Sequence, residues 1–274
     1  MTDELRFTKM VASGNDFVVI DNRLPGGVTR GQPLSGLAKS ICGRKMSVGA
    51  DGMLVIEPSS MADFKMRIFN PDGSEVDMCG NGSRCVALYA MENSIAQKNM
   101  KIETRAGIIN AEVTGLRVKI KMTDPKDMRV ARKIKIGNKT YKAYSVNTGV
   151  PHAVIFSDKV DKVDVKGLGS KVRFHKMFKP QGTNADFVQI LNMKEIKVRT
   201  YERGVEDETA ACGTGSAASA VISSLIYGLK PHIDVTTSGG EVLRVYFEEK
   251  KKKITDLYLE GEARVVFHGR IDHV

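Results

Sequence analysis

The chain has 274 residues, of which 42% are hydrophobic and 27% are charged, and its formal net charge is +10. These proportions are typical of a soluble globular protein, and the length allows two domains that each bury a hydrophobic core. The positive charge does not indicate nucleic-acid binding, because Lys and Arg are scattered, Trp is absent and no aromatic-rich platform for single strands is present.

Short apolar runs in the first half of the chain predict mostly strands. Runs rich in β-branched and aromatic residues are typical of strands, whereas apolar patterns of helical period are typical of helices. The expected strands lie at residues 17–20, 53–56 and 66–69, and within 101–122, with a turn near Gly107. The expected helices lie at residues 36–44 and 82–91.

The second half of the chain repeats this pattern. The expected elements are a strand at 198–202, a helix at 215–227 and strands over 233–267, with a hairpin tip at 248–253. Strands that dominate around one long helix per half predict an α+β fold. We place an N-terminal lobe at residues 1–122 and a C-terminal lobe at 123–264, with a linker near 123–129. The last strand, within 265–274, is a candidate to return to the first lobe.

The sequence offers no export signal and no good membrane span. Its first ten residues include Asp3, Glu4, Arg6 and Lys9, so they lack the apolar core of a signal peptide. Residues 209–229 carry no charge, but their serines and glycines would make a poor span, and a buried helix is the better interpretation. We therefore expect a cytoplasmic protein with no membrane partner.

The two halves are copies of each other. The phrase MCGNGS at residues 78–83 recurs as ACGTGS at 211–216, roughly half a chain later. Further pairs of segments match in the same order and nearly the same register: 14–20 with 149–155, 50–51 with 185–186, 65–69 with 197–201, and 104–107 with 237–240. A period this long indicates two duplicated domains rather than a solenoid. We therefore expect two pseudo-symmetric lobes, each with one cysteine in front of a glycine-rich helix start.

A cysteine at the start of a helix is suited to proton transfer. The helix N-terminus presents unpaired backbone N–H groups and partial positive charge, which lower the pKa of a thiol from about 8.5 into the range of about 3.5–7.5. The same N–H groups can hold a carboxylate. Two such sites, Cys79 and Cys212, can face one carbon, one as thiolate and one as thiol. Removal of a proton from one face and delivery to the other would invert that carbon without a cofactor or a metal.

Other interpretations of these residues are weaker. Cys42 and Cys85 fall inside expected helices and form no C-x-x-C pair, so they are best explained as free, buried hydrophobic residues. Residues 213–218 fit the dinucleotide pattern G-x-G-x-x-A, but a charged loop at 203–208 precedes them instead of a buried strand. A non-catalytic amino-acid-binding protein is a further alternative, which the absence of an export signal disfavours.

Six motifs in this order resemble the diaminopimelate epimerase family over essentially the whole chain. They are SGNDF at 13–17, FNPDGSE at 69–75, MCGNG at 78–82, TNADF at 183–187, YERG at 201–204 and ACGTG at 211–215. The resemblance implies two similar lobes, each a mostly antiparallel sheet wrapped around a central helix. It also implies interconversion of LL- and meso-2,6-diaminopimelate in lysine biosynthesis, by two bases and with no cofactor.

The resemblance also assigns roles to single residues. Cys79 and Cys212 are the implied acid/base pair. The implied substrate contacts are Asn15, Asn70, Gly80, Asn81, Asn184, Glu202, Arg203, Gly213 and Thr214. The chemistry of diaminopimelate agrees, because an arginine fork suits its distal carboxylate and a glutamate suits its distal ammonium. The implied partner is this small amino acid; a homodimer is an assembly that the sequence leaves open.

Two positions depart from the family pattern. The motif commonly read as G-N-P-H is GVPH at residues 149–152, and a glutamine often found in the first half is replaced by Gly52. One asparagine contact is therefore missing or is supplied by a neighbour such as Asn147, while His152 fits a site role and a core or turn role equally well. The alternative is another amino-acid racemase or epimerase of the same fold, proline-type or of broad specificity. Proline-type relatives usually carry His where this chain has Asn81.

Overall fold

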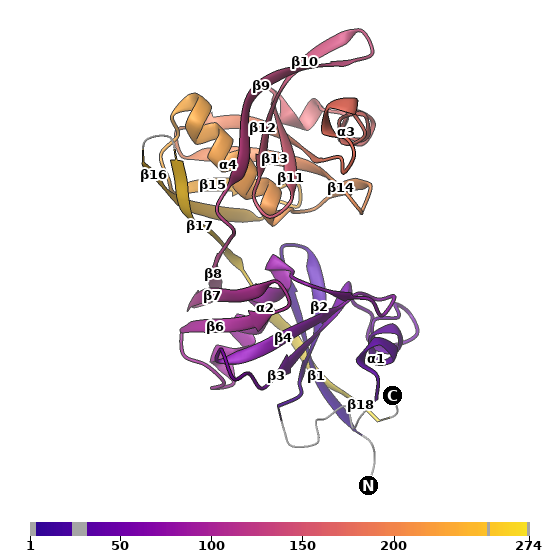
Figure 1. The fold of residues 1–274 in the computed structure, drawn as a ribbon. Helices are drawn as coiled ribbons and strands as arrows, with labels where there is room; N and C mark the ends of the chain where they lie inside the picture. Colours follow the sequence, from indigo (N-terminus) through magenta and orange to yellow (C-terminus); the bar gives the residue numbers. More distant parts are fainter. Residues whose placement is uncertain (1–3, 24–31, 251–252, 273–274) are drawn as a thin grey trace. The chain divides into compact units, whose positions relative to one another are not determined.

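The chain folds into two compact units. The structure is a computed structural model that describes residues 4–23, 32–250 and 253–272. One unit contains the residues up to Ile120 together with those from Gly261 onward, and the other contains Lys121–Glu260. The chain thus leaves the first unit once and comes back to it at its end (Figure 1).

The first unit is built on one sheet and two helices. Its neighbouring strands run in the order β18–β1–β2–β3–β4–β6–β7–β8, and β5 also pairs with β4, on the same edge as β6. The pairs are antiparallel except β2–β3 and β4–β6. The elements are β1 (Leu5–Ala12), β2 (Asn15–Asp21), α1 (Leu34–Ile41), β3 (Gly52–Glu57), β4 (Phe64–Phe69), β5 (Glu75–Val76), α2 (Gly80–Glu92), β6 (Asn99–Thr104), β7 (Gly107–Thr114), β8 (Arg117–Lys121) and β18 (Arg264–Ile271).

The second unit has the same plan. Its strands run in the order β9–β10–β11–β12–β13–β15–β16–β17, with β14 on β13, and the parallel pairs are β11–β12 and β13–β15. The elements are β9 (Lys126–Ile136), β10 (Lys139–Asn147), β11 (Pro151–Phe156), η1 (Val160–Lys162), α3 (Val165–Arg173), η2 (Lys176–Phe178), β12 (Asn184–Asn192), β13 (Glu195–Glu202), β14 (Asp207–Thr209), α4 (Gly213–Tyr227), β15 (Ile233–Thr236), β16 (Val242–Lys250) and β17 (Lys253–Glu262). In this plan β18 of the first unit corresponds to β9 of the second.

The parallel pairs explain where the helices lie. Parallel neighbours cannot be joined by a tight turn and need a crossover, usually a helix. The crossovers contain α1 between β2 and β3, α2 between β4 and β6, α3 between β11 and β12, and α4 between β13 and β15. The chain therefore places α2 and α4 at corresponding points of the two units, each directly after a cysteine.

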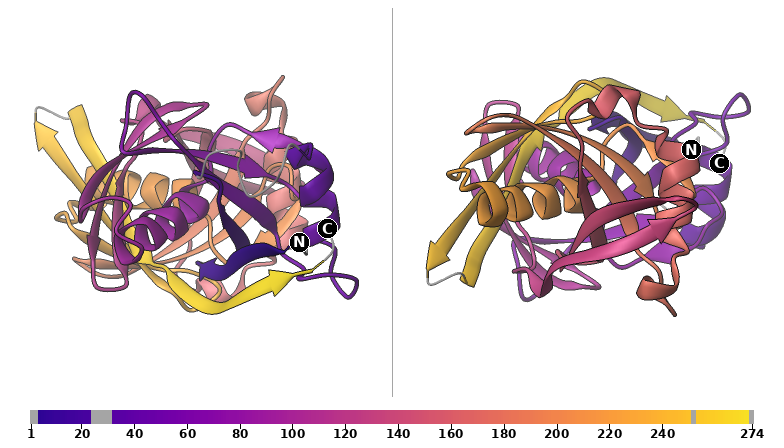
Figure 2. Two further views of the ribbon diagram at one scale, coloured as in Figure 1. Left: turned by 90° about the horizontal axis from the view of Figure 1, so that it is seen from below. Right: turned by 90° about the horizontal axis from the view of Figure 1, so that it is seen from above.

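The two long helices are the centres of their units. Most residues of α2 and α4 are buried, and strands of the same unit contact them: β1, β2 and β7 for α2, and β10 to β13 and β16 for α4. Figure 2 shows α2 in its left view and α4 in its right view, each beside strands of its own unit. Smaller cores under α1 and α3 cover part of each sheet. The expected α+β fold of sheets around central helices is confirmed.

Several expected boundaries were wrong. Both central helices begin two residues earlier than expected, at Gly80 and Gly213, because the cysteines themselves are the N-caps and the glycines already adopt helical backbone. The expected linker at 123–129 contains the start of β9, which pairs with β10. Helix α3 was not expected at all. Within the expected hairpin tip and last strand, residues 251–252 and 273–274 lie outside the described residues.

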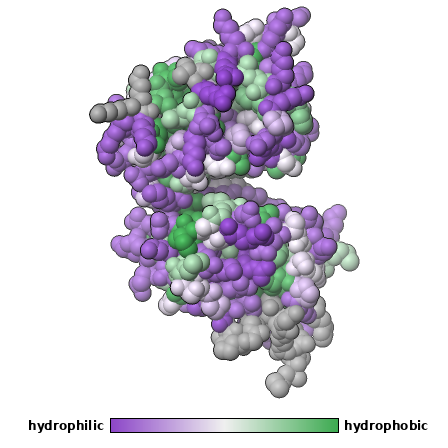
Figure 3. Space-filling model, viewed as in Figure 1, coloured by the Kyte–Doolittle hydropathy of each residue, from purple (hydrophilic) through white to green (hydrophobic). Residues whose placement is uncertain are grey.

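The surface agrees with the basic, polar composition. Figure 3 shows hydrophilic residues over most of the visible face of each unit, with smaller hydrophobic areas between them. In the described parts of the chain, no helix combines the length and the apolar character needed to cross a bilayer.

Candidate active site

Cys79 is the N-cap of α2 in the first unit. Its Sγ accepts a hydrogen bond from the backbone N–H of Gly82 at 3.4 Å, and its carbonyl accepts from the N–H of Ser83 at 2.8 Å. A Cβ atom on Gly82 would lie 3.0 Å from the side chain of Leu54, so this close packing favours glycine. The thiol is partly exposed. It therefore combines access with the N–H groups of a helix start, which favour a negative charge.

Two of the expected substrate-binding residues meet beside this thiol. Asn81 Nδ2 donates to Asn15 Oδ1 at 2.7 Å, and Asn15 Nδ2 donates to Asp51 Oδ2 at 3.1 Å. Asn15 thus connects the first turn of α2 to an acidic residue at the start of β3. This chain of hydrogen bonds fixes the orientation of both carboxamides.

A cluster of charged side chains is linked to this series of hydrogen bonds through Asp51. Asp16 binds Lys9 at 2.6 Å and Arg44 at 2.7 Å, and Arg44 also reaches Asp51 at 2.8 Å. Burial on its own would raise the pKa of Asp16, but the hydrogen bonds from Lys9 and Arg44 outweigh it and lower that pKa to about 2. The Asp16 carboxylate therefore stays ionised at neutral pH.

Asn70 does not join this network. It lies in the turn between β4 and β5, where its Nδ2 donates to Ser74 Oγ at 3.0 Å and its backbone N–H donates to Ser74 O at 2.9 Å. Gly52, the departure noted above, has a packing reason. A Cβ at this position would lie 3.0 Å from the carbonyl oxygen of Phe69 and 3.5 Å from the ring of Phe17, so a larger side chain would force the neighbours apart.

Cys212 is the N-cap of α4 in the second unit, and it is buried. Its Sγ lies 3.5 Å from Thr214 Oγ1. Burial raises the pKa of the Cys212 thiol, and the negative charges of Glu202 and Asp186 raise it further. Burial also raises the pKa of Glu202, although hydrogen bonds with Thr209 and Cys212 oppose that shift. The second thiol is therefore held in its protonated form.

His152 connects the start of α4 to an aspartate. Its Nδ1 lies 2.7 Å from Asp186 Oδ2, and its Nε2 lies 3.0 Å from Thr214 Oγ1. Asp186 also accepts a hydrogen bond from Thr200 at 2.8 Å. In the repeat, Asp186 corresponds to Asp51 and Thr214 to Asn81. His152 therefore links Asp186 to the first turn of α4 in the second unit, as Asn15 links Asp51 to the first turn of α2 in the first unit.

Two other expected residues, Asn184 and Arg203, belong to this cluster, and Thr148, which was not expected, contacts it too. Asn184 Oδ1 accepts a hydrogen bond from the backbone N–H of Arg203 at 2.6 Å, and Asn184 Nδ2 lies 3.4 Å from His152 Nε2. Arg203 Nη1 donates to the carbonyl of Gln181 at 3.3 Å. Thr148 Oγ1 donates to the carbonyl of Thr214 at 2.9 Å, which holds the turn before β11 against the start of α4.

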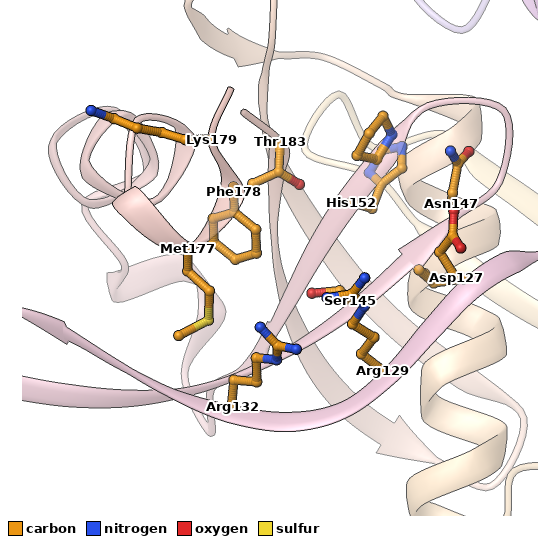
Figure 4. Close-up of a pocket in the computed structure, with 12 residues that line it drawn as sticks. Asp127, Arg129, Arg132, Ser145, Asn147, His152, Met177, Phe178, Lys179 and Thr183 are labelled. Atoms are coloured by element: carbon orange, nitrogen blue, oxygen red, sulfur yellow. The ribbon is translucent and has the colours of Figure 1, made fainter. Parts of the chain in front are cut away.

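A cavity of about 300 Å³ opens beside this cluster in the second unit. Figure 4 shows Asn147 and His152 on one side of it, Thr183 and Phe178 on another, and Arg129 and Arg132 below. Asn147 Oδ1 accepts a hydrogen bond from Gly149 N at 2.9 Å. The oxygen of this side chain is thus engaged in its own turn, while Asn147 also lines the cavity. Within the described residues, no group of three or more His, Cys, Asp or Glu side chains is arranged to hold a metal ion.

Sequence comparisons identify the family. The model of the family described as "Diaminopimelate epimerase" matches residues 7–128 and 144–266. The chain belongs to the diaminopimelate epimerase family. A diaminopimelate epimerase of Caldanaerobacter subterraneus is 41% identical over 98% of this chain and 100% of its own length. One from Aquifex aeolicus is 43% identical over 97% of this chain and 98% of its own. As a member of the diaminopimelate epimerase family, the chain is an isomerase.

Solved structures show the same fold at low sequence identity. A phenazine biosynthesis protein of the PhzF family from Bacillus anthracis matches with a TM-score of 0.74 at 17% identity, over 98% of this chain and 99% of that one. A probable proline racemase from Agrobacterium radiobacter matches with a TM-score of 0.67 at 15% identity, over 97% of this chain and 92% of that one. At such identities the likeness concerns the fold alone.

The sequence missed some of these residues. Asp51, Asp186 and Thr200 were not expected in the site, and His152 was left between two roles. The signal that could have found the aspartates was the repeat itself, because Ala50-Asp51 matches Ala185-Asp186. Their hydrogen-bond partners are distant in sequence, so only the fold brings them together.

Proposed function

We propose that the enzyme interconverts LL- and meso-2,6-diaminopimelate, with Cys79 and Cys212 as its two bases. The observation that carries this proposal is the pair of helix starts, each capped by a cysteine, at corresponding points of two duplicated units. The names and near full-length identity of the curated relatives support the substrate. The chemistry below is what such a pair can do with an α-amino acid.

The proposed reaction is a transfer of two protons across one carbon. The thiolate of one cysteine takes the α-hydrogen as a proton, and the C–H electron pair becomes a carbanion delocalised into the α-carboxylate. The thiol of the other cysteine then gives its proton to the opposite face. Charge and atoms balance, because one S–H bond forms and one breaks, and the two sulfurs exchange roles for the reverse direction. No electron donor or acceptor is required.

The helix starts supply the electrostatic part of catalysis. The carboxylate that receives the carbanion charge would lie against the backbone N–H groups at Gly80-Asn81 and Gly213-Thr214, where the dipoles of α2 and α4 are positive. Donors already oriented toward developing charge lower the barrier without reorganisation. The tight packing at Gly82 supports this role, because it holds the helix start close to β3.

The remaining polar residues are proposed to recognise the rest of the substrate. Asn15 and Asn81 are held in one hydrogen-bonded chain, and Asn184 holds the backbone of Arg203, so these groups are oriented before substrate binds. The Arg203 guanidinium suits a distal carboxylate. Asn70 and Glu202 complete the proposed set of substrate-binding residues. Glu202 also contacts Cys212 and can accept a hydrogen bond from its S–H group.

A solvent-isotope experiment tests this function. The purified enzyme is incubated with LL-diaminopimelate in deuterated water without added cofactor, and products are examined by mass spectrometry and chiral chromatography. We expect deuterium at one α-carbon and formation of the meso isomer. Parallel incubations with L-proline and trans-4-hydroxy-L-proline serve as substrate controls. Turnover of a proline substrate with none of diaminopimelate would replace this proposal with the proline-type alternative.

A further inference from the structure

A buried arginine lies at the start of α2. Arg84 has an exposed fraction of 0%, and it is the largest fully buried side chain among the described residues. Its guanidinium turns back toward the N-terminus of its own helix, where Nη2 donates to Asn81 Oδ1 at 2.8 Å and also to Ser13 Oγ. Arg84 thus touches the carboxamide that binds Asn15 and the turn that precedes β2. Neither composition nor spacing in the sequence indicated this role.

Two positive features therefore meet at the first turn of α2, the helix N-terminus and the guanidinium that contacts Asn81. A helix N-terminus carries partial positive charge, which favours anions and disfavours cations. A guanidinium is always protonated, and a buried charge is costly unless other groups compensate for it. A cation folded back onto a helix start consequently favours a negative charge in the same place, and the Cys79 sulfur caps that helix start.

The second unit differs at the corresponding position. Aligning CGNGSR with CGTGSA places Ala217 where the first unit has Arg84, and Ala217 is also fully buried. The charged groups around Cys212 are the acids Glu202 and Asp186. Each helix start thus has an aspartate at a corresponding place, Asp51 or Asp186, but only the start of α2 also has a buried guanidinium in contact with its first turn.

We propose that Arg84 is a positioning residue that makes the two sulfurs inequivalent, so that the substrate-free enzyme keeps Cys79 as thiolate and Cys212 as thiol. Arg84 does this by adding positive charge at the first turn of α2 and by fixing Asn81 and the Ser13 turn. The inference deepens the proposed function, because it assigns the resting protonation state of the same cysteine pair. It predicts that the isomer whose α-hydrogen faces Cys79 finds the free enzyme ready for proton abstraction.

Alkylation of the thiols tests the inference without substrate. Iodoacetamide is neutral and reacts with thiolates, so the pH of half-maximal alkylation rate follows ionisation, and peptide mass spectrometry assigns each rate to one cysteine. We expect this midpoint to be lower for Cys79 than for Cys212. Arg84→Met should raise the Cys79 midpoint by about one pH unit or more and leave that of Cys212 in place. Arg84→Lys, which keeps the charge, should restore the midpoint.

Two further variants separate charge from packing. Val86→Ala removes buried volume from α2 without changing charge, so it should leave both midpoints in place. If it shifts Cys79 as much as Arg84→Met, or if Arg84→Met shifts nothing, the inference is overturned. Thermal unfolding checks each variant. If Arg84→Met does not fold, the parent and Arg84→Lys decide together: a Cys79 midpoint below that of Cys212 in both supports the inference, and a Cys79 midpoint equal to or above that of Cys212 refutes it. Normal isotope exchange with equal cysteine midpoints would reject this inference alone.

Discussion

His152 Nδ1 lies 2.7 Å from Asp186 Oδ2, and both side chains are fully buried. Replacing His152 by Ala would leave the Asp186 carboxylate and the Thr214 hydroxyl without this partner. Removing one member of a buried pair costs about 3–5 kcal/mol, so we expect a loss of about 3 kcal/mol in the free energy of unfolding, measured by urea denaturation. The control is Lys166→Ala, which breaks an exposed pair with Asp207 and should leave the free energy of unfolding nearly unchanged, because water screens that pair. Equal losses in the two variants would contradict the role of burial.

Glu202 should make stability fall as pH rises. Burial raises its pKa above the ordinary value of 4.5, so the folded protein retains the proton to a higher pH than the unfolded chain. The resulting destabilisation is absent below 4.5 and grows as the pH rises toward the folded-state pKa. Glu202→Gln lacks this titration. The free energy of unfolding of Glu202→Gln, relative to that of the parent, should therefore increase as the pH rises above 4.5 toward neutrality. A difference that stays constant over this range would exclude the effect.

Asp16 should act in the opposite sense at acidic pH. Its pKa falls from 3.8 to about 2, because the hydrogen bonds from Lys9 and Arg44 outweigh the effect of burial. The stability that this ion cluster contributes is fully present above 3.8 and disappears as the pH falls toward about 2. Asp16→Asn should therefore be less stable than the parent at neutral pH, and the two should converge in acid. Thermal unfolding over an acid series measures this convergence; parallel curves would contradict it.

The proposed mechanism requires both Cys79 and Cys212 for proton transfer. General acid–base groups contribute about 10²- to 10⁴-fold to rate, so Cys79→Ser and Cys212→Ser should each lower kcat by about that factor. Cys42→Ala is the matched control, because Cys42 is a buried thiol at the C-terminal end of α1 and belongs to the hydrophobic core there. It should retain nearly the parental rate. The assay is the conversion of LL- to meso-diaminopimelate, and a serine variant with parental kcat would remove that cysteine from the mechanism.

Oxidation gives an independent test of whether the two sulfurs share one substrate carbon. Thiols that flank the same atom can couple once their Cα atoms come within about 7 Å. We expect mild oxidation to inactivate the enzyme, dithiothreitol to restore activity, and mass spectrometry to map a Cys79–Cys212 disulfide. The Cys42→Ala variant should behave like the parent. A fully active sample that carries the mapped bond would rule out the shared site.

The repeat made the main features of the fold predictable. A cysteine followed by Gly-x-Gly predicted both central helices, and apolar runs predicted the strands around them. The same repeat could have predicted α3, since a helix was expected at the corresponding place in the first half. Gly167 and Gly169 weakened the local helical pattern there, yet Asp164 caps this helix by accepting from Gly167 N. Tertiary packing against β12 and β13 then outweighs the weak propensity.

The polar network of the site was less accessible from sequence. Two of its hydrogen bonds join residues far apart in the sequence: Asn15 and Asp51 are 36 positions apart, and His152 and Asp186 are 34 apart. Their formation depends on the parallel pairing of β2 with β3 and of β11 with β12, which places the starts of these strands side by side. The burial of Arg84 was even less predictable, because arginine is rarely fully buried.

The pairing of β18 with β1 has a consequence for synthesis on the ribosome. Leu5 lies opposite Ile271, so β1 cannot pair with β18 until residues 264–271 have been made. The second unit, by contrast, is encoded in a single uninterrupted stretch. The last strand of the C-terminal unit, β17, is therefore made before β18, so the N-terminal unit is the one whose sheet stays incomplete longer.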